Sequence, residues 1–208
     1  SDNGTYGLKI TTTGLITLTN ITADGNKNGI GAQLDNQTFG NPLLPPNVTI
    51  SGINAFSKNS QGGLIVKTYG SILLNNVSAS NNTGGFGADL SNKDSAAPKP
   101  VTITGYGYFD GNGTGGLRIL TKGAITLSSI TANNNTNGMG AYLDNQTHGS
   151  AAFPQNVTIN GSNSFSDNFQ GGLVVRTYGA ILLNNVTADN NTGGYGADLR
   201  NCKLDDSI

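Results

Sequence analysis

The sequence predicts an all-β protein whose short parallel strands wind into a β-solenoid of about eight coils, short and long coils alternating. Three observations support this fold class. The chain contains an internal duplication, its apolar residues alternate with a period of two, and Gly and Asn residues bound the alternating runs. No segment keeps a helical period, so we expect no substantial helix.

The duplication covers nearly the whole chain. Residues 4–10 (Gly-Thr-Tyr-Gly-Leu-Lys-Ile) return as residues 113–119 (Gly-Thr-Gly-Gly-Leu-Arg-Ile), an offset of 109 residues that also relates residues 47–50 to 156–159. We therefore expect a single solenoid domain, residues 1–208, built from two tandem copies at 4–112 and 113–208, of which the second is truncated.

Each copy divides into smaller units, which open with a Gly followed by an apolar residue. In the first unit, residues 8–13 form one alternating run, Gly14 interrupts it, and residues 16–18 and 21–23 form two more runs. Three short strands per unit are typical of one coil of a parallel solenoid. The apolar residues that open the units are Leu8, Ile30, Leu64, Phe86, Leu117, Met139, Leu173 and Tyr195.

Aligning the units on these openers predicts two interior columns. The openers form the first column; the second, in which large and small side chains alternate, is Ile10, Ala32, Val66, Ala88, Ile119, Ala141, Val175 and Ala197. Interdigitation of this kind would fill a narrow core. The same alignment stacks Lys67 on Asp89 and Arg176 on Asp198, so we expect an ion pair on the outer face at each place.

Composition limits the possible functions. Only 11% of the residues are charged, Glu is absent and the net charge is −1, which argues against a nucleic-acid surface. No apolar run approaches the roughly 18 residues of a membrane span. The single cysteine, Cys202, excludes an internal disulfide and is either an ordinary thiol or a link between subunits. A zinc site needs several His or Cys ligands, and the chain has a single histidine, His148, so we expect neither a metal nor a cofactor.

Carboxylates give no sign of a catalytic site. Residues 84–90 (Gly-Gly-Phe-Gly-Ala-Asp-Leu) superficially resemble the repeats of calcium-binding β-rolls, but an apolar residue follows the Asp directly and the unit recurs only after 109 residues. Calcium at Asp89 or Asp198 is therefore the weaker alternative. Most Asp residues occupy repeated or corner positions, and two are adjacent only at Asp205 and Asp206. We expect no catalytic residue and no enzyme activity.

Asparagine is common at the expected corners, where it tolerates a left-handed backbone and stacks into amide ladders. Many of these residues begin an Asn-x-Ser/Thr triplet, so sugar attachment is a second interpretation in an extracellular chain. The candidate attachment sites are Asn20, Asn36, Asn47, Asn76, Asn81, Asn145, Asn156, Asn185 and Asn190.

All six prolines fall in three segments, residues 39–47, 91–101 and 148–156, at one place in each long coil. Proline cannot donate to a central β-ladder, so we expect three loops that leave the solenoid on one side. Two of them carry apolar tips, with Leu43 and Leu44 in the first and Phe153 in the last. They are either plain loops that pack back on the coil or a ridge that contacts a neighbour.

The recurring phrase Gly-Gly-Leu-x-Val-x-Thr-x-Gly-x-Ile-Leu-Leu-Asn-Asn-Val-Thr-Ala-x-Asn-Asn resembles repeats of very large bacterial surface proteins, adhesin-like and abundant in filamentous bacteria such as Chloroflexi. The resemblance covers residues 4–201. It implies a right-handed parallel β-helix, secretion, display at the cell surface, and adhesion or scaffolding. It transfers no catalytic residue to this chain, because none of its motifs carries one.

The leading hypothesis is an extracellular structural building block of a filament, sheath or adhesin stalk. Its partner would be a second copy, or neighbouring repeats of a longer chain, with Leu8 and Ile10 of one unit stacked on Tyr195 and Ala197 of the next. The alternative is a protein that binds or cleaves carbohydrate, such as a cell-surface glycan. Its outer groove would use Tyr69, Tyr178, Lys67 and Arg176, because tyrosine rings stack on sugars and cations attract acidic polysaccharide.

Overall fold

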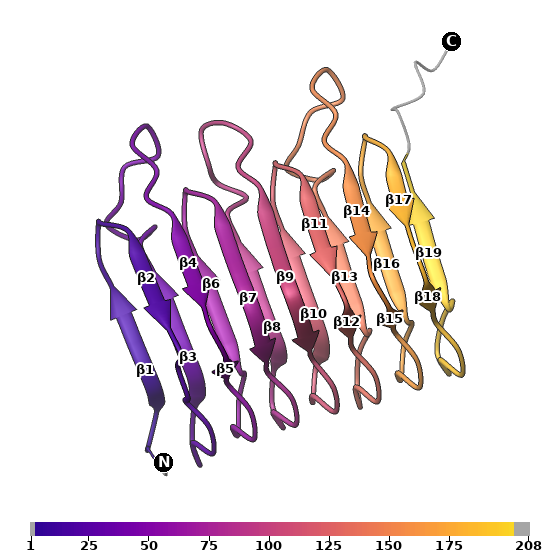
Figure 1. Ribbon diagram of the computed structural model, residues 1–208, viewed down its shortest axis with the longest axis horizontal. Helices are drawn as coiled ribbons and strands as arrows, with labels where there is room; N and C mark the ends of the chain where they lie inside the picture. Colours follow the sequence, from indigo (N-terminus) through magenta and orange to yellow (C-terminus); the bar gives the residue numbers. More distant parts are fainter. Residues whose placement is uncertain (1–2, 202–208) are drawn as a thin grey trace.

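A computed structural model describes residues 3–201, and within them every regular element is a β-strand. The strands form two all-parallel sheets in which the strands between the two ends pair with strands of neighbouring coils on both sides, so the fold is a parallel β-solenoid as predicted. Figure 1 shows the strands stacked along one long axis, with the N-terminal and C-terminal coils at opposite ends.

The first sheet takes one strand from each unit in chain order. It comprises β1 (Tyr6–Thr11), β3 (Ile30–Asp35), β6 (Leu64–Lys67), β8 (Phe86–Ser91), β10 (Gly115–Leu120), β13 (Ala141–Asp144), β16 (Leu173–Arg176) and β19 (Ala197–Arg200).

The second sheet has eleven strands, because most coils turn a corner within it and contribute two short strands. It comprises β2 (Ile16–Thr19), β4 (Val48–Ser51), β5 (Asn54–Ala55), β7 (Ile72–Ser78), β9 (Val101–Tyr108), β11 (Ile125–Ser128), β12 (Ile130–Thr131), β14 (Val157–Asn160), β15 (Asn163–Ser164), β17 (Ile181–Leu183) and β18 (Val186–Thr187). Asparagines with positive φ make several of these corners, Asn20, Asn76 and Asn185 among them.

The predicted interior columns are wrong by two residues in every second coil. Leu8 pairs with Ala32, Ala32 with Leu64, and Leu64 with Ala88, so large and small residues alternate in the first column. The second column is large throughout: Ile10, Leu34, Val66, Leu90, Ile119, Leu143, Val175 and Leu199. The principle of interdigitation holds, but Ile30, Phe86, Met139 and Tyr195 are not core residues.

A column of glycines explains this shift. A side chain at Gly87 would come within 2.8 Å of the carbonyl oxygen of Gly116, and one at Gly116 within 2.4 Å of that of Gly140. The backbones of successive coils approach too closely at this position to leave room for a Cβ atom, so only glycine fits. The residue directly before each glycine points away from the core. The column comprises Gly7, Gly31, Gly63, Gly87, Gly116, Gly140, Gly172 and Gly196.

A buried ladder of asparagines closes one corner of the core. The Oδ1 atom of Asn82 accepts hydrogen bonds from the backbone N–H and the Nδ2 of Asn59, at 3.0 and 2.9 Å, and Asn82 in turn donates both groups to Oδ1 of Asn112. The expected amide ladder therefore exists, and its members are Asn26, Asn59, Asn82, Asn112, Asn135, Asn168 and Asn191.

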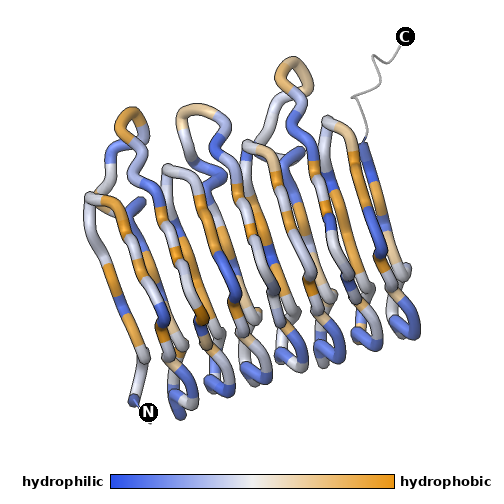
Figure 2. The backbone as a smooth tube through the Cα atoms, viewed as in Figure 1, coloured by the Kyte–Doolittle hydropathy of each residue, from blue (hydrophilic) through white to orange (hydrophobic). Residues whose placement is uncertain are grey.

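Three loops project from one side of the solenoid, between β3 and β4, between β8 and β9, and between β13 and β14, as the prolines predict (Figure 1). Their apolar tips are exposed: Leu43 by 78% and Phe153 by 70%, and the tips of the first and last loops are visibly hydrophobic in Figure 2. At its base, the first loop is bound to the second, because Gln37 Nε2 donates to Asp94 Oδ2 at 2.9 Å.

Candidate functional site

The outward face of the first sheet carries a row of three hollows, centred on β6, β10 and β16. In every second coil, a large residue directly before a glycine of this column lies at or just before the start of the strand and turns outward, and these residues form the walls of the hollows. The walls are Ile30, Phe86, Met139 and Tyr195, and the hollows between them measure about 210, 290 and 190 Å³. The intervening coils place Gly62, Gly115 and Gly171 at the wall position, which leaves each hollow open.

The first and third hollows are the same site in the two copies of the duplication. Each residue that lines the first has a counterpart 109 positions later in the third. The first is lined by Ile30, Gln61, Gly62, Ile65, Gly84, Gly85, Phe86 and Asp89. The third is lined by Met139, Gln170, Gly171, Val174, Gly193, Gly194, Tyr195 and Asp198. The site therefore follows from the repeat.

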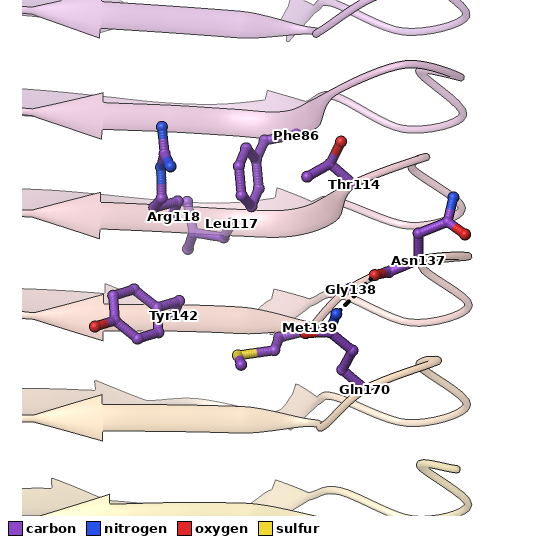
Figure 3. A pocket seen from close by; sticks show the side chains of 9 residues that line it. All are labelled: Phe86, Thr114, Leu117, Arg118, Asn137, Gly138, Met139, Tyr142 and Gln170. Atoms are coloured by element: carbon purple, nitrogen blue, oxygen red, sulfur yellow. Dashed lines mark hydrogen bonds between the residues drawn. The ribbon is translucent and has the colours of Figure 1, made fainter. Parts of the chain in front are cut away.

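The central hollow is the largest and lies between Phe86 and Met139 (Figure 3). Leu117 and Arg118 of β10 line it, and the Tyr142 ring lies at one end. At the other end, Nε2 of Gln170 donates to the backbone oxygen of Asn137 at 3.0 Å, which holds the glutamine across the rim. Its remaining lining residues are Thr114 and Gly138.

An ion pair joins the first two hollows. Arg118 Nε donates to Asp89 Oδ1 at 2.8 Å, and Arg118 Nη2 donates to the other carboxylate oxygen. The hydrogen bond and charge of Asp89 raise the pKa of Arg118, and its guanidinium carbon lies 4.6 Å from the centre of the Phe86 ring. The predicted Lys67–Asp89 pair is wrong, because Lys67 stands opposite Ser91 in the true register.

The predicted pair between Arg176 and Asp198 is also wrong. Asp198 stands opposite Val174 and receives two hydrogen bonds from Arg200 of its own strand, at 2.9 and 2.8 Å. Those bonds lower the pKa of Asp198, and the charges of Arg200 and, from farther away, Arg176 add to this effect. Arg176 stands opposite Asp144, whose Oδ2 accepts a hydrogen bond from the Tyr142 hydroxyl. Burial and the charge of Asp144 raise the pKa of Tyr142, so its hydroxyl is a neutral donor.

The residues expected to form a carbohydrate groove, one set in each copy of the duplication, lie outside the three hollows, and carbohydrate binding by them stays a prediction. Tyr69 and Tyr178 occupy the same place in the two copies, four strands of the first sheet apart, and neither lines any of the three hollows. Lys67 and Arg176 are separated by the same four strands. The sequence signal that marks the hollows is the Gly-x-Gly flanking each wall residue, as in Gly85-Phe86-Gly87.

Two of the nine candidate glycosylation sites are structural. Asn36 and Asn145 are buried, and their Nδ2 atoms donate to backbone oxygens, including that of Gly14 for Asn36 and Gly123 for Asn145, both at 3.1 Å. Sugar attachment there would require breaking these bonds. Attachment at the other seven positions stays a prediction.

Two carboxylates elsewhere have opposite perturbations. Burial would raise the pKa of Asp35, but hydrogen bonds from Thr38 and from the backbone of Gln37 outweigh it and lower the pKa. Burial raises the pKa of Asp110, and a hydrogen bond from the Asn133 backbone only partly opposes it. Asp35 ends β3 and Asp110 follows β9, and both lie outside the hollows.

Residues 3–201 contain no group of three or more His, Cys, Asp or Glu side chains placed to hold a metal, and no helix that could cross a membrane. His148 lies half-buried in the third loop. Burial would raise the pKa of Asp94, but hydrogen bonds from Gln37 and Lys93 outweigh it and lower the pKa, with a smaller contribution from His148. Cys202 lies outside the described residues.

Both end coils expose residues of the predicted inter-subunit contact. Leu8 and Ile10 are half-buried in the edge strand β1, while Ala197 and the 72%-exposed Tyr195 are at the opposite end. No family model, curated protein or solved structure matches the chain. The fold defines it as a parallel β-solenoid, and the resemblance to bacterial surface repeats rests on the motif alone.

Proposed function

We propose that the protein is an extracellular, non-catalytic structural β-solenoid, a building block of a filament, sheath or adhesin stalk that extends by stacking coils end to end. Its rigidity comes from parallel ladders that run the length of both sheets and from the buried asparagine ladder between them. Display at the cell surface rests on the motif resemblance and the sparse charge.

The observation that carries this proposal is the junction between β8 and β10. Because of the duplication, β19 is the second copy of β8, and β1 is the first-copy counterpart of β10. The chain thus contains, at its centre, a folded template for the contact between β19 of one molecule and β1 of the next. There Ala88 faces Leu117 and Asp89 faces Arg118.

Transferring this template corrects the contact expected from the sequence. Ala197 would face Leu8 of the next molecule, Leu199 would face Ile10, and Asp198 would face Lys9, so that apolar columns continue and opposite charges meet. The contact joins unlike surfaces, and its repetition gives an open fibre.

Sedimentation velocity and electron microscopy over a range of protein concentrations test the proposal. Ala197→Arg should stay monomeric, because the arginine would face Leu8 inside the continued apolar column. Thr126→Arg, on the outward side of the central strand β11, is the control and should assemble normally. A wild-type protein that stays monomeric throughout, or fibres of folded Ala197→Arg protein, would contradict end-to-end stacking.

A further inference from the structure

The three hollows form a regular series along the solenoid axis. They are centred on every second strand of the first sheet, β6, β10 and β16. Two spacings between parallel strands amount to about 9.6 Å, so a ligand chain lying along this face would meet an equivalent hollow at that interval. A linear polymer with a matching repeat can use all three hollows at once.

Each hollow combines apolar walls with fixed polar groups. In the first, Gln61 Nε2 donates to the backbone oxygen of Asn28 at 3.1 Å, and in the third, Gln170 donates to that of Asn137. Both glutamines are exposed. Each side chain is held by the hydrogen bond that its amide nitrogen donates, and its amide oxygen can accept a hydrogen bond from a ligand hydroxyl. Walls such as Phe86 offer an apolar surface beside this acceptor. A ligand that has apolar faces and hydroxyl edges fits this lining.

The charged residues that line the hollows are already paired within the chain. Arg118 neutralises Asp89 between the first two hollows, and Arg200 neutralises Asp198 beside the third. A strongly charged polymer would have to compete with these pairs, whereas a neutral one leaves them intact. The lining therefore favours an uncharged ligand.

From these three features we propose that the row of hollows binds a neutral, linear β-1,4-linked glycan lying along the solenoid axis. One pyranose ring of such a chain is close in length to one strand spacing, and successive rings are flipped relative to one another. The same ring face thus returns at every second sugar, as the hollows return at every second strand. This site goes beyond the structural role and does not depend on end-to-end stacking.

Isothermal titration with cellohexaose and chitohexaose tests the site, performed with the Ala197→Arg protein so that stacking does not interfere. A hexamer reaches more than one hollow, so it should bind at least about tenfold more tightly than cellobiose or chitobiose. Phe86→Ala removes the wall shared by the first and central hollows and should weaken hexamer binding about tenfold. Met139→Ala, at the wall shared by the central and third hollows, should do the same.

Tyr108→Ala is the matched control, because Tyr108 is an exposed aromatic residue of β9 in the second sheet. Its binding should stay within about twofold of the parent, with circular dichroism confirming that every variant folds. The proposal is overturned if neither hexamer binds the folded parent, if Phe86→Ala and Met139→Ala leave binding unchanged, or if Tyr108→Ala weakens it equally. Preferential binding of decaproline, whose polyproline II turn has a similar length, would also overturn it in favour of a peptide groove.

Discussion

Replacing Asn82 by alanine tests whether the buried asparagine ladder holds the coils together. Asn82 is fully buried, and its Oδ1 atom is the acceptor for two donors of Asn59, the backbone N–H and Nδ2. Alanine removes this acceptor and also the Nδ2 that donates to Asn112. The Asn112 Oδ1 atom keeps the backbone N–H of residue 82 as a donor, so the main damage falls on Asn59.

The size of the effect follows from the number of orphaned groups. Two buried donors of Asn59 lose their only acceptor in the ladder, and each buried unsatisfied donor costs about 1–3 kcal/mol. We therefore expect Asn82→Ala to lower the free energy of unfolding by about 4 kcal/mol. Asn160→Ala, in an exposed position of β14, should change it by no more than about 0.5 kcal/mol.

Urea unfolding followed by circular dichroism measures this difference. The dependence of the unfolding free energy on urea concentration should have the same slope in both variants, which checks that their unfolded states are comparable. If Asn82→Ala is no more destabilising than Asn160→Ala, the ladder is not a main source of stability, and the reasoning from its hydrogen bonds fails.

Three further predictions concern the core and the charges. Ala88→Leu should cost about 1–3 kcal/mol of unfolding free energy in the same urea assay, because Ala88 is fully buried between leucines of the neighbouring coils; an unchanged value would refute the size alternation. Arg118→Ala should cost no more than about 1 kcal/mol, and the loss should shrink in high salt, since the pair with Asp89 is partly exposed; a salt-independent loss would contradict an electrostatic origin. Asp35→Asn should lower the melting temperature at pH 7, because the lowered pKa of Asp35 stabilises the fold at pH values above the unfolded pKa of about 4; this contribution is lost as the pH falls through the folded pKa. Asp110→Asn should raise the melting temperature at pH 7, because the raised pKa of Asp110 means that its ionised form destabilises the fold. The increase should vanish below about pH 4, where the carboxyl is protonated in both the folded and the unfolded state. Shifts of the same sign for the two variants would refute the assigned environments.

The fold could be predicted because its signals recur along the chain. Period-two runs and corner asparagines return in successive coils, the proline-rich loops return in the long coils, and the duplication repeats the observation. The register could not be settled in the same way. A wall residue such as Phe86 has a glycine on either side, so aligning Gly85-Phe86 or Gly87-Ala88 with Gly116-Leu117 is equally consistent with the pattern.

Only packing distinguishes the two alignments. The chosen register places the glycines where backbones of adjacent coils nearly touch, and a Cβ at Gly87 would collide with Gly116. It also moves Phe86 from the core to the surface, which creates the hollows and changes the partner of Asp89 from Lys67 to Arg118. One local ambiguity thus explains both the wrong ion pairs and the missed site.

Cross-linking across the proposed junction tests end-to-end stacking most directly. Lys9→Cys and Asp198→Cys, each combined with Cys202→Ser, place single thiols on residues that the β8–β10 template sets opposite each other. Facing residues of adjacent parallel strands lie about 4.8 Å apart, within the span of a disulfide. Oxidising an equimolar mixture should give disulfide-linked heterodimers of the two variants. Only monomers, or equal cross-linking when Leu182→Cys replaces Asp198→Cys, would contradict the account.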